Sequence, residues 1–159
     1  MNIEFGCGAN PTRKDYRTCD VRALPGIDYV CPAWNIDQLV DAGTVDVIFS
    51  RHFFEHLTFP QGKLVLSVWH KILSDTGTVE MMIPDMDYHI WQWQNNKNMD
   101  HARAGFWGWQ RQVDDGEIWD IHKSGYNFDT MQELVAEMGY RNCVRIKAPR
   151  KHLYVRFEK

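Results

Sequence analysis

A glycine turn and an acid that follow two strand-like segments carry the clearest chemistry in this sequence. Gly6-Cys7-Gly8 directly follows an apolar segment at residues 2–5, and Asp20 ends a second strand-like segment. Glycines let the backbone approach a charged ligand closely, and a carboxylate at the next strand end can accept hydrogen bonds from two ribose hydroxyls. The pattern therefore predicts a nucleoside site. The short interval between Gly8 and Asp20 and the lack of G-x-x-G spacing argue against a dinucleotide site.

A second motif combines histidines with an acid. His52-Phe53-Phe54-Glu55-His56 matches H-x-x-E-H, a zinc-peptidase signature in which two histidines on one helical face hold the metal and the glutamate acts as a base. The sequence shows no third carboxylate ligand, so we expect no metal. We favour a structural role in which Glu55 and His56 fix the following loop. A zinc peptidase is kept as a remote alternative.

The length and composition of the chain limit the class of protein to which it can belong. The chain has 159 residues, 44% of them hydrophobic and 25% charged, with a formal net charge of -3. This length suits one domain with a full core, and we expect a single domain over residues 1–159. The weak net charge predicts no nucleic-acid partner, and the lack of a long apolar run predicts no membrane partner. Four cysteines without C-x-x-C spacing and no recognisable signal peptide predict a reduced, cytoplasmic protein.

Strand-like and helical segments alternate along the chain. We expect strands at residues 2–5, 17–21, 28–31, 45–49, 78–83, 141–147 and 152–158, and helices at residues 35–42, 61–73 and 129–138. This order predicts a Rossmann-like α/β fold whose sheet is mainly parallel, with one antiparallel strand at its end. Ligands of such sheets bind beyond the carboxyl ends of the strands.

An aromatic-rich insert is expected at about residues 86–121, and we predict that it is irregular. It contains Trp91, Trp93, Phe106, Trp107, Trp109 and Trp119. These side chains can form a local hydrophobic lid, an aromatic floor for a sugar or a flat acceptor, or the surface of a homodimer.

Taken in order, these segments resemble the small class I S-adenosylmethionine-dependent methyltransferases often described as type 11. The matching segments are residues 4–8, 18–20, 45–57, 69–78, 82–85, 122–129 and 138–140. Each segment alone is weak, but their succession extends over nearly the whole chain. The resemblance implies S-adenosylmethionine as cofactor.

The resemblance also implies a role for individual residues. Gly6, Cys7 and Gly8 would form the turn beside the methionine end of the cofactor, and Glu4 would orient that loop or the ammonium group. Asp20 would take the ribose hydroxyls, with Val21 beside it. The remaining implied cofactor residues are Ala33 and Trp34 near the adenine and Ser50 and Arg51 after the fourth strand.

Several residues depart from the family pattern. Asn10 stands where a third glycine is frequent, and Pro32 stands where many relatives carry an acid for the adenine amine. Asp28 and Asp37 are less well placed substitutes. The helix usual before the first strand is missing and the helix after it is short, so we expect one side of the cofactor site to be open or covered by a second subunit.

The function expected from the resemblance is methyl transfer to an oxygen or nitrogen of a small molecule or saccharide. An oxygen acceptor needs a base, and His52, His122 and Asp85 are the catalytic candidates, each with a structural role as the alternative. Two other functions stay open on the same scaffold. One is a cofactor-binding module that is non-catalytic or depends on a partner, and the other is a lyase or hydrolase that cleaves the cofactor.

Overall fold

The computed structural model describes residues 1–110 and 119–159, so the part of the expected insert at residues 111–118 lies outside the described residues. Within the described chain, one seven-stranded sheet has the order β3-β2-β1-β4-β5-β7-β6. The strands are β1 (Asn2–Phe5), β2 (Arg17–Asp20), β3 (Tyr29–Val30), β4 (Val45–Arg51), β5 (Leu73–Pro84), β6 (Arg141–Arg145) and β7 (His152–Glu158). Strands β1 to β5 pair in parallel, whereas β7 is antiparallel to both β5 and β6. The predicted fold class is confirmed.

Two of the helices match expected ones, although their bounds differ. They are α1 (Phe59–Ile72) and α4 (Phe128–Glu137). Helix α1 begins before residue 61 because Thr58 and Gln61 form a reciprocal capping box. The helix expected at residues 35–42 is instead a short 3-10 helix, η1 (Ala33–Gln38), and a second one, η2 (Phe54–His56), follows β4.

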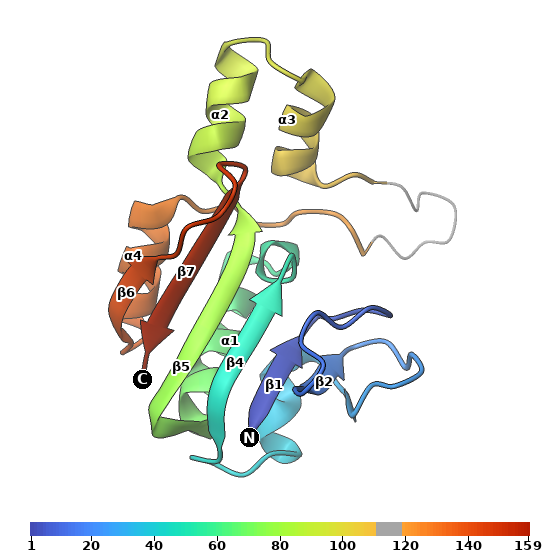
Figure 1. Cartoon of the computed structure of the whole chain (residues 1–159), viewed down its shortest axis with the longest axis vertical. Coiled ribbons are helices and arrows are strands. Elements are labelled where there is room, and N and C mark those ends of the chain that lie inside the picture. The colour runs from blue at the N-terminus through green and yellow to red at the C-terminus, as the bar shows by residue number, and fades with distance from the viewer. Residues whose placement is uncertain (111–118) are drawn as a thin grey trace.

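The prediction of an irregular insert is wrong for most of its described part. Helices α2 (Met86–Gln94) and α3 (Met99–Trp107) form a helical hairpin beyond the carboxyl ends of the strands (Figure 1). Asp85 caps α2 by accepting a hydrogen bond from the backbone amide of Asp87, and Asn98 caps α3 in the same way. The dense tryptophans obscured these caps, which mark where the helices begin.

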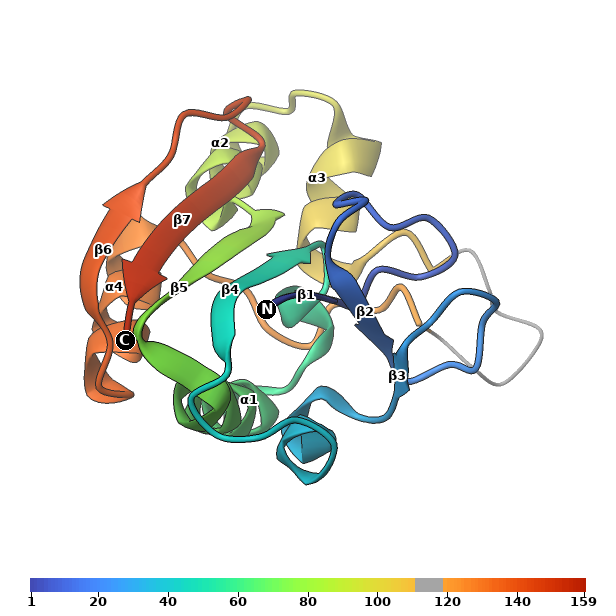
Figure 2. The same ribbon diagram turned by 60° about the horizontal axis from the view of Figure 1, so that its bottom comes forward.

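The long helices α1 and α4 cover one face of the sheet (Figures 1 and 2). Strand β5 shows the consequence, since Val79, Met81 and Ile83 are buried whereas the alternate residues Glu80 and Met82 remain partly exposed. In Figures 1 and 2 no helix of the described residues lies on the opposite face. No helix in the described chain is both long and apolar enough to cross a membrane.

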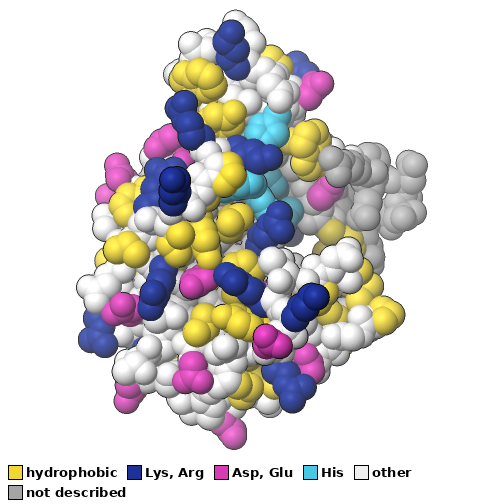
Figure 3. Space-filling model, in the orientation of Figure 1, with side chains coloured by type: hydrophobic (Ala, Val, Ile, Leu, Met, Phe, Trp, Pro, Cys, Tyr) yellow, Lys and Arg dark blue, Asp and Glu magenta, His cyan; other side chains and the backbone are white. Residues whose placement is uncertain are grey.

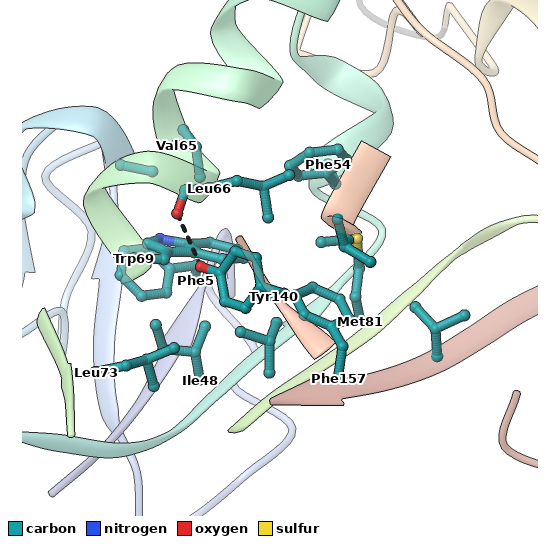
Figure 4. Close-up of a cluster of buried hydrophobic side chains, with 14 of the residues drawn as sticks. Phe5, Ile48, Phe54, Val65, Leu66, Trp69, Leu73, Met81, Tyr140 and Phe157 are labelled. Atoms are coloured by element: carbon teal, nitrogen blue, oxygen red, sulfur yellow. Dashed lines mark hydrogen bonds between the residues drawn. The ribbon is translucent and has the colours of Figure 1, made fainter. Parts of the chain in front are cut away.

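The core beneath the site is centred on Trp69 of α1, which is completely buried. Its ring lies 4.8 Å from that of Phe5, centroid to centroid, so β1 and α1 are packed directly together. The Tyr140 hydroxyl donates a hydrogen bond of 2.8 Å to the carbonyl of Leu66, which ties the segment after α4 to α1 (Figure 4). The strand ends that carry the site therefore rise from a close-packed core.

Candidate functional site

The glycine turn after β1 lies directly against the end of β2. Gly6 and Gly8 adopt positive φ angles of 65° and 58°, which L side chains rarely adopt. The Gly8 amide donates to Asp20 Oδ2 at 2.9 Å, and the Gly6 amide donates to the carbonyl of Cys19 at 2.8 Å. The structure thus brings together the turn and the acid from which a nucleoside site was predicted.

Glu4 acts on the loop that follows the turn. Its side chain is 2% exposed, and its carboxylate accepts hydrogen bonds from the backbone amides of Thr12 (2.9 Å) and Arg13 (2.7 Å). Hydrogen bonds to an ionised acceptor are strong, so Glu4 fixes the return of this loop to the sheet. Glu4 was expected to orient either this loop or the ammonium group of the cofactor, and these contacts are with the loop.

Asp20 is held by more than the turn. Arg22 donates to Asp20 Oδ1 from its backbone amide at 3.0 Å and from Nε at 3.1 Å. Burial alone would raise the pKa of Asp20, but the hydrogen bonds from Arg22 and Gly8 outweigh it and lower that pKa. Asp20 is therefore an ionised acceptor whose oxygens already have donors. We expect that a ligand binding to Asp20 has to displace Arg22.

Replacing Arg22 tests this competition. We expect Arg22→Ala to tighten the binding of a nucleoside ligand at Asp20 by a few-fold, because a partly exposed ion pair worth about 0.2–1 kcal/mol no longer has to be broken. Isothermal titration calorimetry with S-adenosylhomocysteine measures the change. Arg17→Ala, which removes a more exposed arginine–aspartate pair with Asp28, is the control and should leave the affinity unchanged. A weaker affinity in Arg22→Ala would show that Arg22 supports the ligand and does not compete with it.

A cavity, here called the first cavity, opens beside this turn. Five of the predicted cofactor residues line it: Gly6, Asp20, Val21, Ala33 and Trp34. The rest of its lining consists of Phe5, Cys19, Cys31, Pro32, Phe53, His56, Leu57, Gln61, Trp119 and Lys123. Most of these are apolar, so the cavity combines a charged acceptor at one wall with surfaces suited to a flat ring.

The two substitutes considered for the adenine contact lie elsewhere. Asp28 accepts hydrogen bonds from Arg17 and Thr18, and Asp37 pairs with Lys71 at 2.8 Å. Neither aspartate is among the described residues that line the first cavity. Pro32 does line it, so an adenine would meet an apolar wall at this position.

Cys7 lies in the turn but is not among the described residues that line the first cavity. Burial, followed by the negative charges of Asp20 and Glu4, raises the pKa of Cys7 to about 11. The reactive thiolate is therefore scarce at neutral pH. We expect iodoacetamide to alkylate Cys7 more slowly at about pH 8 than it alkylates a free cysteine in solution. Peptide mass spectrometry over time checks this, and a rate equal to that of free cysteine would contradict it.

A second cavity lies between the strand ends and the α2–α3 hairpin. Six of the seven histidines of the chain line it: His52, His56, His89, His101, His122 and His152. Figure 3 shows histidine side chains gathered at the surface in this region. His56 also lines the first cavity, so the two cavities adjoin there. The histidines come from five separate segments, and no spacing in the sequence identifies them as a group.

The structure places the other predicted site residues differently. Arg51, His52 and His122 line the second cavity. Ser50 is completely buried, and its hydroxyl has no hydrogen-bond partner among the described residues. Asp85 is 2% exposed, caps α2, pairs with Arg145 and lies outside the described lining of both cavities.

The H-x-x-E-H motif does not form the helical pair of a zinc peptidase. His52 has a φ of 50° and precedes η2, which is only three residues long, so His52 and His56 do not share a helical face. His52 Nδ1 instead lies 3.0 Å from Glu55 Oε1. Burial by itself would raise the pKa of Glu55, but the hydrogen bond from His52 and the nearby imidazoles lower it.

Burial keeps several of these histidines uncharged. It lowers the pKa of His122, and together with the neighbouring imidazoles it lowers the pKa of His89 to about 4. Burial, followed by His52, Lys151 and Arg51, lowers the pKa of His152 to about 4. Neutral imidazoles can accept a proton or bind a metal ion. The second cavity is therefore rich in nitrogen lone pairs.

Several solved structures that are similar to this chain are methyltransferases. The chain is similar to a SAM-dependent methyltransferase from Archaeoglobus fulgidus, with 11% identity, a TM-score of 0.68, and coverage of 99% of this chain and 85% of the other. It is also similar to the CurJ carbon methyltransferase (13% identity, TM-score 0.62), covering 99% of this chain and 47% of that one. A third similar structure is a 1,6-didemethyltoxoflavin-N1-methyltransferase from Burkholderia thailandensis with bound S-adenosylhomocysteine. Its identity is 11% and its TM-score 0.59, and the match covers 99% of this chain and 68% of the other.

These similarities identify the fold of this chain. The chain has the sheet order and layers of a class I S-adenosylmethionine-dependent methyltransferase. No protein-family model matches the chain. No curated protein matches it in sequence.

Proposed function

We propose that this protein is an S-adenosylmethionine-dependent methyltransferase that acts on an oxygen or nitrogen of a small molecule or saccharide. The observation that carries the proposal is the contact of Asp20 with the glycine turn at the wall of the first cavity, on a sheet with the class I methyltransferase order. The Burkholderia neighbour, with S-adenosylhomocysteine bound, supports the same ligand for this fold.

The residues of the first cavity fit this cofactor. Asp20 is an ionised acceptor for the ribose hydroxyls once Arg22 moves aside. Ala33 and Trp34 supply an apolar wall for the adenine, and Gly6 lets the backbone approach the methionine end. When bound, S-adenosylmethionine supplies a methyl group on a positively charged sulfur.

The second cavity is the proposed acceptor site. It adjoins the first at His56, which supports the proposal that an acceptor bound there would lie next to the methyl group. His52 and His122 are the candidate bases that would take the proton of an acceptor hydroxyl, and Arg51 can bind an acidic substituent. Alignment of the two ligands by the cavity walls would supply much of the rate gain, as expected for an in-line transfer.

The exposed indoles near this cavity favour a flat or sugar-like acceptor. Trp109 lines the second cavity and is 50% exposed. Trp93 and Trp107 are also exposed and lie together on the α2–α3 hairpin, with ring centroids 5.8 Å apart. Their exposure also keeps the homodimer surface open as a proposal.

Transfer can be tested with S-adenosylmethionine labelled in the methyl group. The full chain would be incubated with a panel of phenols, amines, sugars and nucleotide sugars, and label in the separated acceptors would be counted. We expect transfer to at least one acceptor class. Cofactor binding without transfer would support the non-catalytic module, and loss of cofactor without an acceptor would support a lyase or hydrolase. Absence of cofactor binding would reject all three.

A further inference from the structure

Three side chains in the second cavity converge in a way that the proposed methyl transfer does not require. Glu55, His56 and His122 each offer a ligand atom, and these atoms all lie within 4.8 Å of one another. Glu55 and His56 belong to η2, whereas His122 directly follows the insert. The backbone joins the two segments, since the Glu55 carbonyl accepts hydrogen bonds from the amides of Lys123 (2.8 Å) and Ser124 (3.2 Å).

Both imidazoles are held in one orientation by backbone carbonyls. His56 Nδ1 lies 2.9 Å from the carbonyl of Ile121, and His122 Nδ1 lies 2.9 Å from the carbonyl of Gly105. A carbonyl only accepts, so each Nδ1 carries the hydrogen and each Nε2 keeps its lone pair. Metal-binding histidines in proteins commonly donate their other ring nitrogen in this way, which fixes both the tautomer and the ring.

The carboxylate provides an independent indication of a missing ligand. Glu55 is 1% exposed, and while its Oε1 meets His52, its Oε2 is buried and has no hydrogen-bond partner among the described residues. A buried charged oxygen without a partner is destabilising, and native proteins rarely keep one. A cation bound beside Oε2 would satisfy it.

We propose that Glu55, His56 and His122 form a binding site for a divalent transition metal ion, with zinc as the best match. Two imidazoles and one carboxylate are the protein ligands of catalytic zinc sites that keep a further coordination position open. The same donors also suit iron(II), whereas magnesium and calcium prefer all-oxygen sites. The sequence predicted no metal because the third ligand comes from a distant segment.

His52 and His101 also line the cavity but are not among the three proposed ligands. His52 donates to Oε1 of Glu55 and would orient the carboxylate, as outer partners of metal ligands do. His101 contacts Gln92 at 2.9 Å and is not part of the converging group. The alternative is that the cavity binds a metal ion through any of its imidazoles. Variants of individual histidines distinguish that alternative from the three-residue site.

The position of the site suggests what the metal does there. His56 lines both cavities, so a metal on His56 would lie where the proposed cofactor and acceptor meet. A hydroxyl bound at the open position would lose its proton more readily, because a divalent ion stabilises the oxyanion. With its lone pair on the metal, His122 would not take that proton, which leaves His52 as the candidate base. This role rests on the proposed methyl transfer, whereas the binding of the metal does not.

Zinc binding can be measured on the full chain after removal of metals with EDTA and dialysis. We expect about one zinc ion per chain by calorimetry and elemental analysis, and a cobalt(II) complex with the strong visible absorption of a four- or five-coordinate ion. Glu55→Gln and His122→Asn should each weaken zinc binding by at least about tenfold. His101→Asn inside the cavity and His70→Gln outside it are the matched controls and should bind zinc as the unchanged chain does.

Three results would overturn the site. They are no zinc or cobalt binding by the unchanged chain, undiminished binding by both Glu55→Gln and His122→Asn, or an equal loss in either control. Circular dichroism shows whether each variant is folded, and if a variant unfolds, the cobalt spectrum of the unchanged chain decides the question. A parallel titration with S-adenosylhomocysteine separates failure of the metal site from failure of the proposed function, because the two ligands are measured independently.

Discussion

Asp20→Ala is expected to weaken the binding of S-adenosylhomocysteine by about 10- to 100-fold, the change that follows from loss of a charged acceptor for two ribose hydroxyls. The substitution also removes the acceptor of the Gly8 amide and of Arg22, so the turn itself loses a support. Both effects act in the same direction. Isothermal titration calorimetry of the variant and the unchanged chain measures the ratio of the two dissociation constants.

Asp28→Ala is the matched control for this variant. Asp28 directly precedes β3 and is more exposed than Asp20, but it likewise accepts hydrogen bonds from a backbone amide and an arginine, and its pKa is lowered chiefly by the Thr18 amide. It lies outside the described lining of the first cavity. Its loss should lower stability without changing affinity. Equal affinities in Asp20→Ala and the unchanged chain would contradict the assignment of the ribose to Asp20.

Gly6→Ala is expected to cost about 2–5 kcal/mol of the free energy of unfolding. Two effects add at this position. The φ of 65° strains any L side chain, and a Cβ would come within 2.6 Å of the Cβ and Cγ of Phe53. The Phe53 atoms that it meets are at the base of the side chain, so a change of rotamer does not relieve the contact with Cβ. Urea unfolding followed by circular dichroism gives the difference in free energy.

Gly26→Ala separates the two effects. Gly26 has a φ of 83°, but a Cβ there meets nothing within 4 Å. It should therefore show only the backbone strain, about 1–2 kcal/mol. A Gly6→Ala variant no less stable than Gly26→Ala would show that Phe53 yields easily. The close approach of Phe53 to the turn would then not be a structural constraint.

The sequence was sufficient to predict the sheet but not the insert. An apolar segment followed by a glycine marks β1, and a strand-like segment ending in an acid marks β2. An apolar run marks β4, and the alternation at residues 153–157 marks β7. Helices α2 and α3 were missed because their aromatic residues give no clear apolar stripe. Their start signals, Asp85 and Asn98, were read as a candidate base and as part of a loop.

The candidate site was likewise predictable from the sequence only in part. Gly8 and Asp20 were expected to lie together because each follows a neighbouring parallel strand, and the structure joins them directly. The competing role of Arg22 was missed, because nothing in its position two residues after Asp20 indicates where the guanidinium turns. The meeting of His56 with His122 depends on how the insert folds back over the strand ends, which no local pattern encodes.

The most direct test of the methyltransferase assignment is a calorimetric titration of the unchanged chain with S-adenosylhomocysteine, with adenosine and NAD as comparison ligands. We expect saturable binding of about one S-adenosylhomocysteine per chain, tighter than that of adenosine, and no binding of NAD. Absence of S-adenosylhomocysteine binding, or tighter binding of NAD, would contradict it.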